Sequence, residues 1–146
     1  MYHLGDIKLV RSVASKQRAI SAVIANWKAL VCHLEDDAVE GRTGEEKATA
    51  QSLASTLKTY RFVYMLHFLA DLFSILQKLS ETFQRNDICI SHVPSAVKKT
   101  IRKLAKLEAS PRSGGQLEAF QKAYHPKTEE WSGVVLNLTV KDRHAG

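Results

Sequence analysis

The chain has 146 residues, of which 45% are hydrophobic and 25% charged, and its formal net charge is +6 with a pI near 9.4. This length supports one domain with a hydrophobic core. The sequence contains no internal repeat or low-complexity tract, which excludes solenoid and low-complexity classes. The basic balance suits an acidic partner such as nucleic acid, although a solvated lysine-rich surface gives the same charge.

The first half of the chain has a helical pattern of apolar residues. From residue 6 the pattern covers one helix or two, with a main helix over 15–35 that carries Trp27 at the centre of its stripe. The acidic segment 35–46 has two glycines and almost no apolar residue, so we predict a loop there. Thr43 and Glu46 have the spacing of a capping box, which predicts a second helix over 44–58 that either continues or bends near Thr59.

The stretch 60–85 predicts a long central helix. Its apolar residues recur at steps of three and four, and three more widen the face, so we expect neighbouring helices around it. Leu69, like Trp27, should be buried at the centre of its stripe. Polar residues interrupt it too often for a membrane span, which needs about 20 largely apolar residues. The whole pattern predicts an all-α fold, an irregular bundle of four to five helices.

The last third predicts two shorter helices and a tail. Ser91 is a candidate cap and Pro94 fits a first turn, followed by an inner stripe of Val97, Ile101, Leu104 and Leu107. Prolines, serines and glycines break the pattern before a short helix over 116–124. We therefore expect a single helical domain over 6–124 and an irregular tail over 125–146, with Trp131 exposed.

The cysteines and histidines that could bind a metal are better explained as ordinary core or surface residues. A zinc site would need Cys32 and His33 together with Cys89 and His92, but adjacent residues on a helix point in different directions. We expect core cysteines, surface histidines and no cofactor.

His67 and Asp71 are an i, i+4 pair without any accompanying nucleophile motif, so a hydrogen bond at a helix surface is the favoured interpretation. Asp36 and Asp37 fall in the acidic loop and lack a third acid, so we read them as solvated charges.

One predicted helix carries a basic stripe that is a candidate contact for a DNA backbone. It consists of Lys98, Lys99, Arg102, Lys103 and Lys106. No aromatic residue alternates with these charges, so stacking on single-stranded bases is not expected. Weak binding to phosphates and an ordinary solvated helix face both remain open.

Two segments carry a resemblance to a known family. NWKALVCHLED at 26–36 and YRFVYMLHFLADLFSILQKLSETFQRNDICISHV at 60–93 resemble the helical insertion region of hAT-superfamily transposases, in particular the domesticated group related to zinc finger protein 862. ASKQRAI at 14–20 resembles the second part of a further family motif, whose Arg-Trp is replaced here by Ser12 and Val13. The resemblance spans about residues 10–110.

This resemblance implies a function in association rather than catalysis. The three acids that bind metal in hAT transposases belong to a ribonuclease-H-like core, and no position here matches one of them. The resemblance implies a non-enzymatic, nuclear remnant that associates with itself or with a partner protein and contacts DNA weakly, with no small-molecule substrate and no membrane. The alternative is a stand-alone helical adaptor that accepts a partner helix. The adaptor predicts one apolar groove, whereas the remnant predicts incomplete burial together with a basic face.

Overall fold

The computed structural model describes residues 4–84, 90–112, 114–139 and 142. Five α-helices follow in order: α1 (Leu4–Glu40), α2 (Gly44–Leu57), α3 (Tyr60–Gln84), α4 (Val93–Ala109) and α5 (Gln116–Ala123). The 3₁₀-helix η1 (Ile90–His92) precedes α4, and the strands β1 (Glu130–Trp131) and β2 (Val134–Val135) follow α5. The predicted all-α class with a long apolar helix from Tyr60 is thus confirmed.

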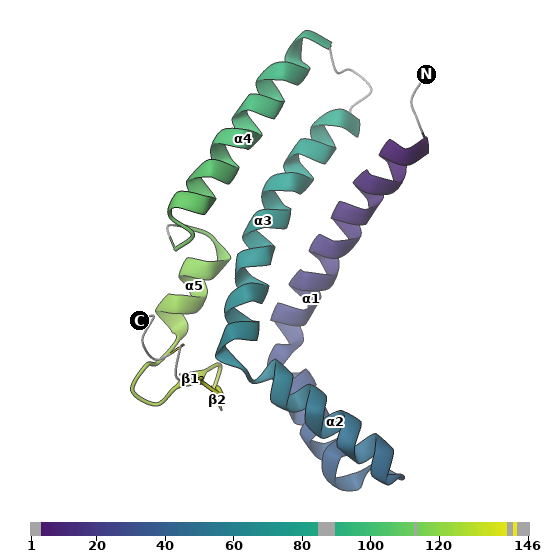
Figure 1. The fold of residues 1–146 in the computed structure, drawn as a ribbon, viewed down its shortest axis with the longest axis vertical. Helices are drawn as coiled ribbons and strands as arrows, with labels where there is room; N and C mark the ends of the chain where they lie inside the picture. Colours follow the sequence, from purple (N-terminus) through teal and green to yellow (C-terminus); the bar gives the residue numbers. More distant parts are fainter. Residues whose placement is uncertain (1–3, 85–89, 113, 140–141, 143–146) are drawn as a thin grey trace.

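The upper part of the molecule is a layer of three helices. Figure 1 shows α1, α3 and α4 side by side, with α3 in the middle and in contact with both neighbours. The hairpin of α1 and α2 extends beyond one end of the layer, and α5 with the strands lies at the foot of α4. α5 contacts α3 on a further side, but none of the residues on the opposite face of α3, from Met65 to Phe83, is fully buried, so the expected enclosure of α3 by helices is wrong.

The turn between α1 and α2 is shorter than the predicted acidic loop. α1 continues through the acidic residues to Glu40, and Gly41 ends it with a backbone bond to the Asp37 carbonyl of 2.9 Å. A Cβ atom at position 41 would lie 2.7 Å from that carbonyl oxygen, so the turn requires glycine. The predicted capping box is confirmed, because Thr43 and Glu46 each accept from the other's backbone N–H.

The chain bends sharply between α2 and α3, at the position where the sequence allowed a bend. The carbonyl of Lys58 accepts from the N–H of Asn137 at 2.7 Å, and the N–H of Tyr60 donates to the carbonyl of Asn137 at 3.0 Å. The Trp27 indole N–H also donates to the Leu57 carbonyl at 3.0 Å. These long-range partners satisfy backbone groups that a continuous helix would have used internally.

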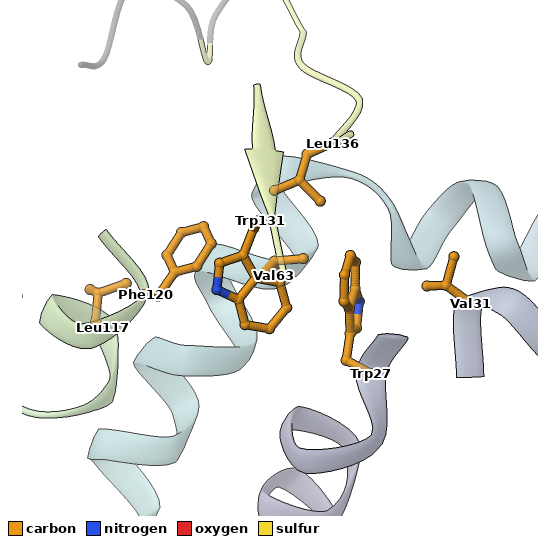
Figure 2. Close-up of a cluster of buried hydrophobic side chains, with 7 residues drawn as sticks. All are labelled: Trp27, Val31, Val63, Leu117, Phe120, Trp131 and Leu136. Carbon is orange, nitrogen blue, oxygen red and sulfur yellow. The ribbon is translucent and has the colours of Figure 1, made fainter. Parts of the chain in front are cut away.

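The hydrophobic core lies at the lower end of the layer. Its buried side chains come from α1, α3, α5 and the strand region, and they are Trp27, Val31, Val63, Leu117, Phe120, Trp131 and Leu136 (Figure 2). The ring centroids of Trp27 and Trp131 are 4.6 Å apart. Trp131 is only 7% exposed, so the expectation that it is exposed is wrong. The hairpin that carries it turns at Ser132 and Gly133, which both have positive φ, as in a two-residue type I′ turn.

His67 belongs to the core rather than to the surface. Its ring is 3% exposed, stacks on Phe120 with a centroid distance of 4.9 Å and meets the edge of Trp131 at 5.1 Å. Its Nδ1 lies 2.8 Å from the Val63 carbonyl oxygen, so Nδ1 carries the proton of the neutral ring. The expected surface pair with Asp71 is therefore wrong, since Asp71 binds the backbone of α5 instead.

The burial of His67 predicts a loss of stability at acidic pH. Burial lowers its pKa below the ordinary value of 6.5, against opposing effects of the Val63 carbonyl and the Asp71 charge. Below pH 6.5 the unfolded chain therefore binds a proton that the folded chain does not. The contribution is complete above that pH and is lost as the pH falls toward the lower folded pKa.

We expect urea unfolding to show this loss as a difference between wild type and His67→Gln, which removes the titrating group. Between roughly pH 7 and pH 5, wild type should lose more free energy of unfolding than the variant. All other ionisable groups are the same in the two proteins, so their contributions cancel in the difference. Equal losses in the two proteins would contradict this role for His67.

Candidate functional site: the basic helix α4 and the apolar face of α3

The five basic residues of the predicted stripe all lie on α4 and are all exposed. At 3.6 residues per turn, they span one continuous arc of about 140° around the helix. The arc runs in the order Lys103, Lys99, Lys106, Arg102 and Lys98. None of the five forms an ion pair with a residue that the structure describes. The structure therefore brings these charges together on one side of α4.

The inner side of α4 differs from the predicted stripe. Thr100 is 8% exposed and donates its hydroxyl to the Ala96 carbonyl at 3.0 Å, whereas Ile101 is 59% exposed. The expectation that Ile101 faces inward is wrong. Ala96 and Thr100 lie on the side of α4 that lines the groove against α3, and this orientation turns Ile101 outward. His92 occupies the cap position without a side-chain bond, so the prediction of a Ser91 cap is also wrong, while Pro94 lies in the first turn as predicted.

Two of the basic residues also border a groove between α3 and α4. The groove has a volume of about 180 Å³, and Lys99 and Lys103 line it together with Lys78 of α3. Its remaining lining residues are Ile75, Leu79, Thr82, Ala96 and Thr100. No acid lines the groove, so its rim is positive and continuous with the arc on α4. The groove is too small to hold a helix.

The face of α3 that points away from the core is apolar along its whole length. We call it the α3 seam, and it consists of Met65, Leu69, Leu72, Leu76, Leu79 and Phe83. None of the six is buried: Met65 and Phe83 are 44% and 43% exposed, and the other four are half-buried. The expected burial of Leu69 is therefore wrong, whereas Trp27 is 1% exposed as predicted. The α3 seam was not singled out as a site from the sequence, although its spacing is visible there.

The other predicted metal or catalytic groups do not converge. Cys32 and His33 are both exposed on α1, so the expectation that Cys32 is a core residue is wrong, and Cys89 lies outside the described residues. Asp36 and Asp37 lie on α1 rather than in a loop, and Asp37 Oδ2 is 3.5 Å from His33 Nε2. Within the described part of the chain, no three His, Cys, Asp or Glu side chains are grouped so that they could hold a metal ion.

A wide hollow between the end of α1 and α2 has a lining of mixed polarity. It has a volume of about 970 Å³, and its lining includes Asp37, Glu40, Arg42, Glu45 and Glu46. Leu34, Ala50 and Leu53 line it as well, so charged and apolar residues alternate where a helix-binding adaptor has a mainly apolar groove.

By length and composition alone, α3 could cross a membrane. Its mean hydropathy reaches 1.3, and 22% of the residues in that window are buried. One helix that passes this test is weak evidence for a span, because core helices of soluble proteins pass it as well.

No known protein-family model matches this chain, and no solved structure matches it significantly. The features of this chain that bear on its function are therefore the basic arc on α4 and the α3 seam.

Proposed function

We propose that this chain is a non-catalytic helical association module of the hAT-transposase-derived type, with an auxiliary, sequence-indifferent contact to DNA. The observation that carries the proposal is the α3 seam, a continuous apolar face that the rest of the described chain leaves partly exposed. Large apolar faces of this kind mark interaction sites on soluble proteins. A transposase remnant is expected to combine incomplete burial of apolar side chains with a basic face. A location in the nucleus, which the resemblance implies, would give the basic face access to DNA.

The adaptor alternative has less support from the described surfaces. An adaptor of this class holds its partner helix in a concave apolar groove. The groove between α3 and α4 measures about 180 Å³, and the larger hollow beside α2 mixes charged residues with Leu34, Ala50 and Leu53. The α3 seam is a helix face rather than a groove, which favours association over the capture of a single peptide.

The association function is tested by placing a photo-crosslinking amino acid at Leu72, in the middle of the α3 seam, in living cells. A matched control carries it at Lys78, which is exposed on the same helix but outside the seam. We expect protein crosslinks from position 72 and far fewer from position 78. If neither position crosslinks, the chain is not an association module.

The DNA contact predicts a characteristic salt dependence. If about four of the charges on α4 touch phosphates, the logarithm of affinity should fall against the logarithm of salt concentration with a slope of about −3 to −4. Arg102 is the only one of the five side chains suited to bidentate base recognition, so affinity should be similar for different duplex sequences. Titration of labelled duplexes at several salt concentrations measures both quantities.

A triple variant identifies the residues responsible. Replacement of Lys99, Arg102 and Lys106 by glutamine should flatten the slope by roughly 2 to 3 and leave the fold intact, since all three are exposed. The matched control replaces three exposed lysines elsewhere, Lys16, Lys47 and Lys127, and so changes the net charge equally. If both variants flatten the slope equally, overall charge rather than α4 determines the binding.

A further inference from the structure

We infer that the α3 seam binds a second copy of this chain, so that two α3 helices pack against each other across a two-fold axis. This inference rests on the proposed association function and names its partner. Three observations carry it: the spacing of the α3 seam, the amount of surface that the single chain leaves exposed, and the distribution of charge around the layer.

The spacing of the α3 seam is that of a helix that packs on another helix. Its residues follow one another at steps of four, three, four, three and four, which is the a/d pattern of a heptad repeat. The seam covers eighteen residue steps, or about 27 Å at 1.5 Å per residue. Leucine occupies the four central positions, from Leu69 to Leu79. Such a row forms knobs that fit between the residues of a facing helix.

The residues on the core-facing side of α3, opposite the seam, show which side of the helix is better suited to burial. At the same heptad steps, half a turn away, the core-facing line reads Val63, His67, Ala70, Ser74, Gln77 and Glu81. This line is buried as far as Ala70 and then becomes polar, with Gln77 Nε2 donating to Glu81 Oε1 at 2.8 Å. In its second half α3 is therefore more apolar on the side that the single chain leaves uncovered than on the side that continues the core.

The single chain exposes more surface than a compact monomer of the same mass, which leaves room for an interface with a partner. The chain exposes 10490 Å², whereas a compact monomer of 16.3 kDa exposes about 7500 Å². The excess of about 3000 Å² exceeds the roughly 800 Å² that each partner buries in a standard interface. A flat layer with α3 in its middle has an open side because α1 and α4 cover only the flanks of α3 (Figure 1).

The charge distribution favours a second copy over an acidic partner at this face. None of the six side chains of the α3 seam is charged, and a two-fold interface requires a self-complementary patch. The exposed Ile101 lies on the flank of α4 opposite Lys99, so it extends the apolar face rather than the basic groove. Lys98, Arg102 and Lys106 do not line the groove between α3 and α4, whereas Lys99 and Lys103 line it together with Leu79 of the seam. Two copies with a charge of +6 each can therefore meet at the seam with three of the five α4 charges outside the adjoining groove.

The test is sedimentation equilibrium of the full chain over micromolar to submillimolar concentrations. We expect wild type to have twice the mass of the 16.3 kDa chain. Leu72→Glu should raise the dimer dissociation constant at least about 100-fold, since each copy would bury an unpaired charge. The double variant Met65→Glu with Phe83→Glu should do the same without a change in helicity, because both residues are already exposed in the single chain. The control Lys78→Glu should remain dimeric.

Several outcomes would overturn the inference. A wild-type monomer whose position 72 still crosslinks to a different protein would refute the second copy and leave the association function intact. A monomer without crosslinks would refute both. A monomer that cosediments with neutral phosphatidylcholine vesicles, and loses this binding in the double variant, would assign the α3 seam to a lipid surface instead. A dimer that persists in Leu72→Glu and in the double variant would place the interface elsewhere.

Discussion

Trp131→Ala should lower the free energy of unfolding by about 3 to 5 kcal/mol, as expected for removal of a buried tryptophan. Trp131 is 7% exposed and contacts the rings of Trp27, His67 and Phe120, so its loss leaves a cavity among elements from both ends of the chain. Urea unfolding followed by circular dichroism measures the loss. Protein concentration must be equal for all variants, because association would add to the stability of the wild type.

Two further variants isolate the cause of this loss. Val135→Ala lies in the same hairpin at a residue that is 51% exposed, and it should cost no more than about 0.5 kcal/mol. In the double variant with Trp27→Ala, the two losses should fall short of additivity by about 0.5 to 1.5 kcal/mol, because the indoles contact each other. A loss below about 1 kcal/mol for Trp131→Ala would mean that the hairpin does not belong to the core.

Asp71→Ala should lower the free energy of unfolding by about 2 to 3 kcal/mol, since hydrogen bonds to a charged acceptor contribute more than neutral ones. Asp71 Oδ1 accepts from the N–H of Gln116 at 2.7 Å, and Oδ2 accepts from the N–H of Leu117 at 3.0 Å. A carboxylate of α3 therefore caps the first turn of α5, where the helix dipole favours negative charge. Gly115 makes room for it, because a Cβ atom there would clash with the Asp71 carboxylate.

The matched control removes another acid from the first turn of α5. Glu118→Gln weakens an ion pair with Lys122 and a backbone hydrogen bond from Gly114, both at the surface, and we expect a much smaller loss of stability than for Asp71→Ala. Amide hydrogen exchange of α5 should accelerate in Asp71→Ala and remain unchanged in Glu118→Gln. Equal stability of both variants would show that Asp71 does not anchor α5 to α3.

Local signals in the sequence were sufficient for the helices themselves. The periodicity of apolar residues predicted α3 and α5 closely, and the Thr43–Glu46 capping box predicted the start of α2, because these signals act within one or two turns of chain. The five charges on α4 were also predictable, since one helix is enough to bring them together. The hairpin after α5 was missed, although Ser132-Gly133 between apolar residues is a turn signal.

The tertiary structure decided which side of each helix is covered. The sequence favoured Leu69 as buried because its row is the more apolar one, yet the core formed on the side of Val63 and His67, where α5 and Trp131 pack. The same long-range contacts ended α2 at Leu57, since Asn137 binds the backbone of Lys58 and Tyr60. Periodicity specifies the faces of a helix but not their neighbours, because the neighbours come from segments far away in the chain. The uncovered α3 seam is therefore a property of the fold, although each of its residues could be read from the sequence.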